Sequence, residues 1–149
     1  MKVCLVCSSG GHLQELLRLR KAWCNLEHFW VSFPGVDTDF LLAEEEMIAA
    51  YHPTNRNLFN LFRNAIIAWK VLRVRNPDLI ISTGAGVAIP FFYLGRLFGI
   101  KTIYIESLTR IHGLSLTGKL IYPVASHFYV QWPGLARRLR KAVYGGQVL

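Results

Sequence analysis

The chain has 149 residues, of which 52% are hydrophobic and only 17% are charged. A chain of this length is typical of one domain, and its apolar content excludes a disordered or low-complexity protein, because such chains lack the apolar surface that offsets chain entropy. The formal net charge is +8 at pH 7 and the mean hydropathy is +0.30. A basic, apolar chain favours an anionic partner, and either a membrane or a second subunit that covers apolar surface.

The apolar pattern alternates short strand-like runs with longer helical ones. In chain order we expect a strand at 2–7, a helix at 12–24, a strand at 28–33, a short helix or turn at 37–45, a weak strand at 47–51, a helix at 57–75, a strand at 78–82, a turn at 83–87, a helix at 88–98, a strand at 101–105, a helix at 118–124, a strand at 127–131 and a helix at 133–141. Uniformly apolar strands that alternate with helices indicate a mostly parallel sheet covered on both faces. We therefore predict an α/β fold, a Rossmann-like doubly wound domain that spans residues 1–149.

Membrane-spanning and disulfide-stabilised classes are both disfavoured. The longest stretch without a charge covers residues 79–95 and contains glycines and a proline, whereas a spanning helix needs about 20 apolar residues. The N-terminal residues do not resemble a signal peptide. Cys4 and Cys7 lie three apart in a predicted strand, so their side chains should point to opposite faces and should not bind one metal ion. We expect buried cysteines in a reducing compartment.

The first predicted strand leads into the glycine-rich loop Ser8-Ser9-Gly10-Gly11-His12. In a doubly wound sheet, ligands bind at the carboxyl ends of the strands, and free N–H groups at a helix start attract phosphate. The structural alternative is a tight turn with a serine cap. His12 is placed to contact a bound anion or to act as a base, although a capping or packing histidine is the alternative.

A second glycine-rich loop covers residues 82–87. It fails as a dinucleotide fingerprint because Ile89 stands at the third glycine position, and a general phosphate-binding loop fits better. The run from Gly113 to Lys119 reads G-x-x-x-x-G-K, but Leu120 replaces the hydroxyl residue that an NTPase needs for magnesium. The D-x-D at residues 37–39 is too common a pattern to indicate a metal site. We predict neither a metal ion nor another cofactor.

Two basic segments remain. The predicted helix at 57–75 interleaves arginine and lysine with aromatic and aliphatic residues. This pattern fits a helix on anionic lipid headgroups, and it equally fits a helix packed on the sheet with its charges in water. Residues 137–141 are also basic and are open to contact with lipid, nucleic acid or protein. Because nothing else resembles an RNA-binding module, we expect no nucleic-acid partner.

Several of these segments resemble one family. Residues 8–13 and 77–90 resemble the two glycine-rich loops of GT-B glycosyltransferases of the MurG type, and residues 99–106 resemble their next strand with its acidic end. The stretches 106–123 and 128–133 are more particular, because they resemble a split-enzyme branch. That branch contains the bacterial PssD/CpsF-type capsule and exopolysaccharide proteins and the membrane-recruiting subunit of the second N-glycan GlcNAc transferase.

The resemblance implies half an enzyme, namely the N-terminal acceptor domain of a GT-B glycosyltransferase. A separate PssE-type chain would bind the UDP-sugar, and the acceptor would be a polyprenyl-diphosphate-linked saccharide in capsule or exopolysaccharide synthesis. We expect peripheral attachment to the cytoplasmic, inner face of the cell membrane. The implied reaction is an inverting transfer without a metal ion, which needs a general base.

The resemblance also assigns site residues. His12 and Glu106 are the candidate bases. The acceptor diphosphate would be held by residues of the two loops and by two cations, which are Ser9, Gly10, Gly11, Thr83, Gly84, Gly86, Arg110 and Lys119. Two other functions stay open at this point. One is a non-catalytic scaffold that recruits and stabilises the donor-binding chain at the membrane, and the other is a stand-alone nucleotide-binding enzyme.

Overall fold

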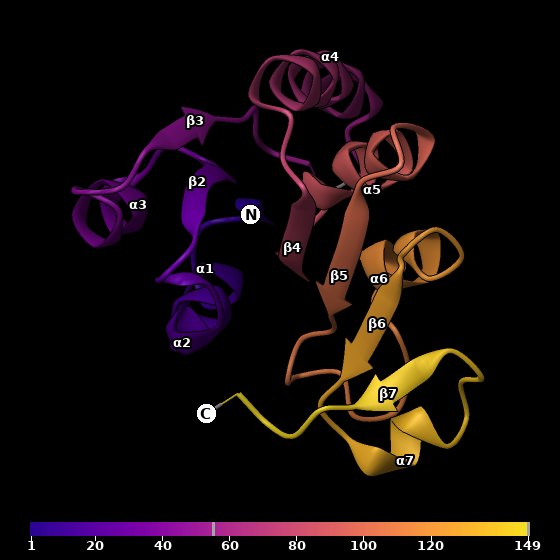
Figure 1. The fold of residues 1–149 in the computed structure, drawn as a ribbon. Coiled ribbons are helices and arrows are strands. Elements are labelled where there is room, and N and C mark those ends of the chain that lie inside the picture. The colour runs from indigo at the N-terminus through magenta and orange to yellow at the C-terminus, as the bar shows by residue number, and fades with distance from the viewer. Residues whose placement is uncertain (55, 149) are drawn as a thin grey trace.

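The structure is a computed structural model that describes residues 1–54 and 56–148, in which seven parallel strands form one sheet (Figure 1). The strands stand in the order β3-β2-β1-β4-β5-β6-β7. Their bounds are β1 Lys2–Cys7, β2 Glu27–Ser32, β3 Met47–Ala49, β4 Leu79–Gly84, β5 Lys101–Ile105, β6 His127–Val130 and β7 Ala142–Tyr144. The predicted α/β, Rossmann-like parallel sheet is confirmed. Its strand order reverses between β1 and β4, which is where ligands bind in such sheets.

Helices lie on both faces of this sheet, as Figure 1 shows. The helix bounds are α1 Gly11–Arg18, α2 Arg20–Trp23, α3 Val36–Leu41, α4 Leu58–Arg75, α5 Ala88–Leu97, α6 Leu116–Ile121 and α7 Pro133–Ala136. One face packs against α4, α5 and α6, and the other packs against α1 and α2. Among the described residues, no helix has both the length and the apolar character needed to cross a bilayer.

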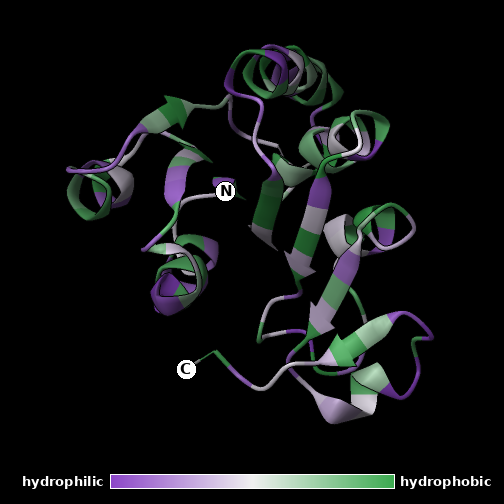
Figure 2. Cartoon of the chain, viewed as in Figure 1, coloured by the Kyte–Doolittle hydropathy of each residue, from purple (hydrophilic) through white to green (hydrophobic). Residues whose placement is uncertain are grey.

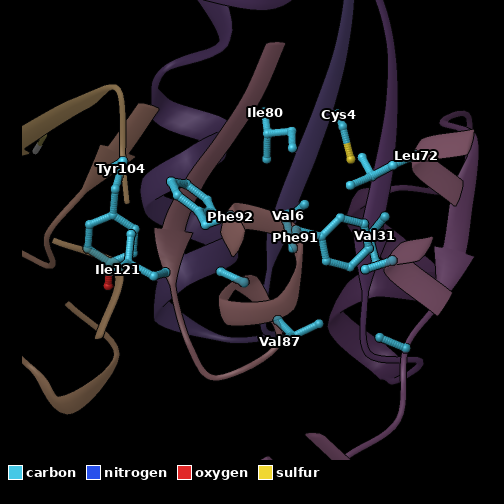
Figure 3. Packing of buried hydrophobic residues seen from close by; sticks show 14 of the residues in the cluster. Cys4, Val6, Val31, Leu72, Ile80, Val87, Phe91, Phe92, Tyr104 and Ile121 are labelled. Carbon is cyan, nitrogen blue, oxygen red and sulfur yellow. The ribbon is translucent and has the colours of Figure 1, made fainter. Parts of the chain in front are cut away.

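The larger core lies between the sheet and α4–α6 (Figure 3). Phe91 and Phe92 of α5 are fully buried there, and the Tyr104 ring of β5 stacks on Phe128 of β6 with centroids 5.0 Å apart. Burying one such aromatic side chain stabilises the fold by about 1.5–3 kcal/mol, so this layer holds α5 firmly on the strands.

The smaller core lies under α1 and α2, where Trp23 packs edge-on against Trp30 at 5.2 Å. Cys4 belongs to the larger core and Cys7 to this one, so the prediction that they point to opposite faces is confirmed. Burial raises the pKa of the Cys7 thiol to about 12 and that of the Cys4 thiol further still. An apolar groove of about 230 Å³ remains on this face, between α2, the strands β4–β6 and the C-terminal residues.

The long helix α4 shows why the sequence left two interpretations open. It begins after Asn57, whose side chain accepts from the Asn60 N–H at 2.9 Å, and it ends at Asn76 in the left-handed conformation, directly before a proline. One face packs Ala68 and Leu72 into the core, while the opposite face exposes large apolar side chains. The sheet-packing interpretation is therefore confirmed for one face. On the other face, Trp69 still packs against Phe98, with ring centroids 5.3 Å apart.

Three predicted boundaries are wrong in ways that change an element. The helix expected at 12–24 breaks at Leu19, which has φ −83° and ψ 12°, and so forms α1 and α2. The C-terminal helix ends at Ala136 and gives way to β7, an edge strand of three residues that is too short to show a period. The strand β4 continues to Gly84, so Thr83 and Gly84 are strand residues and not part of a turn. Pairing of Gly84 with Cys7, past an irregularity in β1, extends β4 in this way.

Candidate functional site

A cleft of about 770 Å³ opens at the carboxyl ends of β1, β4 and β5, on the edge where the strand order reverses. It is bounded by the loop between β3 and α4, by the loop between β5 and α6, and by the start of α6. The cleft carries four basic side chains, a row of hydroxyls and one carboxylate. The polar and charged residues that line it are Ser8, Ser9, His12, His52, Thr54, Arg56, Glu106, Ser107, Thr109, Arg110, Ser115 and Thr117. Such a lining is suited to an anionic ligand.

The first glycine-rich loop enters this cleft with its serines and His12. Gly10, at φ 78°, adopts the left-handed conformation that glycine tolerates best, and it turns the chain into α1. Its N–H donates to Asp37 Oδ2 at 2.6 Å, so α3 ties down the turn. The predicted residues Ser9 and His12 therefore line the cleft, whereas Gly10 at the turn and Gly11 at the start of α1 are outside its lining.

His12 is held by its neighbours on β4. Thr83 Oγ1 donates to the His12 carbonyl oxygen at 2.6 Å, and the imidazole lies directly against Gly84. A Cβ at Gly84 would stand 2.6 Å from His12 Cε1, so only a glycine leaves room for this ring. Nδ1 of His12 is buried and has no hydrogen-bond partner among the described residues. Thr83 and Gly84 thus position His12 and do not themselves line the cleft.

Gly86 lies on the cleft wall, where the β4–α5 turn meets the loop before α4. A Cβ at this position would approach the Thr54 side chain to 3.1 Å. The buried Asn64 of α4 fixes the same loop, because its side chain accepts from the Tyr51 N–H at 2.8 Å and donates to the Tyr51 carbonyl at 2.9 Å. This loop supplies His52 and Arg56, two side chains of the cleft lining that the sequence analysis missed.

Glu106 faces the cleft, but its carboxylate is already bound. It accepts from the Ser107 N–H at 3.1 Å, the Ser115 N–H at 3.0 Å and the Ser115 hydroxyl at 3.0 Å, and its side chain is almost fully buried. Ser115 in turn caps α6 by accepting from the Gly118 N–H at 2.9 Å. The G-x-x-x-x-G-K run is therefore a helix start around a buried carboxylate, because Gly118 packs directly on Glu106.

A second carboxylate, Glu15 on α1, holds the loop that follows Glu106. Its Oε1 accepts from the Ser107 hydroxyl at 2.9 Å and the Leu108 N–H at 3.3 Å, and its Oε2 accepts from Gln131 Nε2 at 3.3 Å. This network links the helix that begins beside His12 to the loop that carries Arg110. Sequence reasoning missed Glu15, although it lies three residues after His12 and so shares its side of the helix.

The two predicted cations separate in the structure. Arg110 lines the cleft, whereas Lys119 lies exposed on α6 outside the cleft lining. Burial, together with the nearby Glu106 carboxylate, raises the pKa of the Tyr104 hydroxyl well above its usual range, so Tyr104 stays neutral in the larger core. Among the described residues, no cluster of three potential metal ligands occurs.

The family described as "Oligosaccharide biosynthesis protein Alg14 like" matches residues 49–148. The chain belongs to the Alg14-like family. Human UDP-N-acetylglucosamine transferase subunit ALG14 is 26% identical over all of this chain and 83% of its own length. The rat protein of the same name is 37% identical over 97% of this chain and 82% of its own length. The matched region of the Alg14-like chain includes Glu106, its partner Ser115 and Arg110, whereas His12 lies before this region.

Solved structures show the fold of the Alg14-like chain in larger proteins. Acinetobacter baumannii MurG superposes with a TM-score of 0.77 at 18% identity, over 98% of this chain and 45% of that one. Staphylococcus aureus MnaA, solved with UDP, superposes with a TM-score of 0.76 at 11% identity, over 99% of this chain and 45% of that one. The chain therefore spans less than half of the length of these structural neighbours.

Proposed function

We propose that this Alg14-like chain is the acceptor-binding, membrane-associated subunit of a two-chain inverting glycosyltransferase. A separate PssE-type chain supplies the UDP-sugar, and the acceptor is a polyprenyl-diphosphate-linked saccharide of capsule or exopolysaccharide synthesis. In this proposal residues 1–149 act as one acceptor domain at the cytoplasmic face of the cell membrane. The observation that carries the proposal is a cleft lined by His12, Arg56 and Arg110, in a chain related to UDP-N-acetylglucosamine transferase subunits.

The cleft supports an anionic acceptor. Arg56, on the loop before α4, and Arg110, on the loop before α6, both line it, so the phosphates of a diphosphate would meet positive charge. The hydroxyls of Ser8, Ser9 and Thr117 add neutral donors to the same space. We assign diphosphate binding to these groups. Gly86, which has no side chain, would let the backbone of the cleft wall come close to the diphosphate. Gly10, Gly11, Thr83 and Gly84 act in this scheme by shaping the cleft wall.

His12 is the general base of the proposed reaction. A neutral imidazole takes the proton of the acceptor hydroxyl while that oxygen attacks the anomeric carbon of the donor sugar. The bond from that carbon to the UDP oxygen breaks, UDP leaves with the electron pair, and the configuration inverts. We assign Glu106 a positioning role, because its oxygens already accept from three donors and it holds the start of α6.

The test is reconstitution of transfer from a UDP-sugar to a polyprenyl-diphosphate saccharide, with this chain alone, with the donor chain alone and with both. We expect activity only in the mixture. His12→Ala should lower kcat by about 10²–10⁴-fold, as expected for a lost general base, while the complex still forms. His127→Ala is the matched control, because His127 is exposed at the opposite end of β6.

Two outcomes would overturn the proposal. Full activity of the His12→Ala mixture would make this chain a scaffold that recruits the donor chain without taking part in the chemistry. Tight binding of the UDP-sugar by this chain alone would make it a nucleotide-binding protein in its own right.

A further inference from the structure

We propose that Gln131, the first residue after β6, is a positioning residue that fixes Arg110 relative to His12 in the cleft. The inference rests on the proposed function, since it names the group that sets the distance between the base and a diphosphate-binding cation. Gln131 is 2% exposed and lies outside the cleft lining. Its side chain lies where three segments meet, namely α1, the loop after β5 and the segment after β7. Figure 2 shows hydrophilic residues in the last two of these segments.

The hydrogen bonds of the Gln131 amide join three distant parts of the chain. Nε2 donates to the Glu106 carbonyl oxygen at 3.0 Å and to Glu15 Oε2 at 3.3 Å. Oε1 accepts from the Val148 N–H at 2.7 Å. A carbonyl oxygen can only accept and a backbone N–H can only donate, so these partners permit one orientation of the amide. The side chain is therefore held at both of its polar atoms.

An amide at this buried position needs a reason. Gln131 lies on the wall of the apolar groove, together with Ile103 and Ile105. Burial of an amide costs free energy unless hydrogen bonds offset it, whereas a methionine or leucine would bury a similar surface without that cost. Packing alone therefore does not explain the amide. Its hydrogen bonds to Glu106 and Glu15 do, because both partners hold the loop that enters the cleft.

The loop that receives these bonds is a tight turn that ends at Arg110. The Arg110 N–H donates to the Ser107 carbonyl oxygen at 3.0 Å and so closes the turn. Leu108, inside the turn, is held on both sides of its backbone. Its N–H donates to Glu15 Oε1 at 3.3 Å, and its carbonyl oxygen accepts from Trp132 Nε1 at 2.7 Å. The two residues that follow β6 thus fix the turn, and with it the place of Arg110 in the cleft.

The same amide ties this turn to the helix that begins beside His12. Glu15 lies about one turn after His12 on α1, and it bonds Gln131 with one oxygen and the loop with the other. His12 and Arg110 both line the cleft, but they follow β1 and β5, which are separated in the sheet by β4. Gln131 and Glu15 bridge that separation. A fixed separation favours an acceptor whose reacting hydroxyl and diphosphate lie a set distance apart.

The first measurement, amide hydrogen exchange, does not depend on activity. Gln131→Met keeps the length of the side chain and removes its three hydrogen bonds, so exchange at the Leu108 and Arg110 N–H groups should accelerate by about tenfold or more. The matched control is Thr102→Val. It removes a buried hydroxyl that accepts from the Ser126 N–H at 2.9 Å, between the same two strands but at their opposite end. This control should leave exchange at Leu108 and Arg110 unchanged.

The second measurement is steady-state transfer by the complex with the donor chain. Gln131→Met should raise KM for a diphosphate-linked acceptor by about tenfold, and should change KM for an acceptor without the diphosphate by less than about twofold. Arg110→Gln should show the same difference between the two acceptors. Addition of Gln131→Met to Arg110→Gln should raise KM no further, because Gln131 acts through Arg110. Thr102→Val should leave both KM values unchanged.

Three results would overturn the inference: unchanged exchange in Gln131→Met, equal rises in KM on both acceptors, or additive effects of Gln131→Met and Arg110→Gln. The last two would show that Gln131 serves the fold alone. Absence of transfer by the wild-type complex would instead refute the proposed function. Accelerated exchange in Gln131→Met would in that case still support the positioning of Arg110, and unchanged exchange would refute it.

Discussion

Replacement of Glu106 separates a positioning role from a chemical one. In Glu106→Ala, the N–H groups of Ser107 and Ser115 lose their acceptor at the partly buried wall of the cleft, and the Ser115 hydroxyl loses one of its partners. Each unsatisfied buried donor costs about 1–3 kcal/mol. Removal of a buried charge returns some desolvation energy, so we expect the free energy of unfolding to fall by about 2–4 kcal/mol.

For a domain of this size, that loss lowers Tm by about 2–4 °C per kcal/mol, which gives roughly 5–15 °C. Thermal unfolding followed by circular dichroism measures it. Glu106→Gln keeps the shape of the side chain but turns an amide NH₂ toward one backbone donor. The free energy of unfolding should therefore fall by about half as much as in Glu106→Ala. His12→Ala removes a side chain whose Nδ1 has no partner among the described residues, and should change stability by less than about 1 kcal/mol while activity falls.

A Glu106→Ala variant that unfolds at the wild-type temperature yet abolishes transfer would refute the positioning role. That result would mean that the carboxylate is free enough to act on substrate, and Glu106 would replace His12 as the base.

Three further predictions concern residues around the cleft and the core. Gly84→Ala should displace the His12 ring and strain the backbone, which has φ 136° at this position. We expect the free energy of unfolding to fall by about 1–3 kcal/mol and the rate of transfer to fall in the mixture with the donor chain. An unchanged kcat would contradict the contact between Gly84 and His12. Glu15→Gln should free the loop at Ser107, which predicts a larger rise in KM for the acceptor than fall in kcat; a fall in kcat alone would refute a positioning role. At pH 8 a thiol reagent should titrate only the exposed Cys24 in the folded protein, because burial raises the pKa of the other two thiols and keeps them protonated; three fast thiols would contradict this burial.

The alternation of apolar runs was enough to predict a parallel doubly wound sheet, because strands buried on both faces leave an unbroken apolar signature. The ends of the strands were harder to predict from the sequence. Nothing local in Ser82-Thr83-Gly84 distinguishes a strand end from a turn, and the choice is made by pairing with Cys7 on β1. The strand β7 was missed for the same reason, since its three residues form a strand by pairing with β6 and are too few to show an alternating pattern.

For the site, the sequence alone determined that two glycine-rich loops and His12 lie at the carboxyl edge of the sheet, because topology fixes where such loops emerge. Only the tertiary structure decided what each residue does there. It turned the Glu106 carboxylate toward Ser115, set Gly84 against the His12 ring, and brought Arg56 from a loop that carries no motif into the same cleft. Distances between side chains from different strands depend on how the layers pack, and no spacing along the chain encodes them.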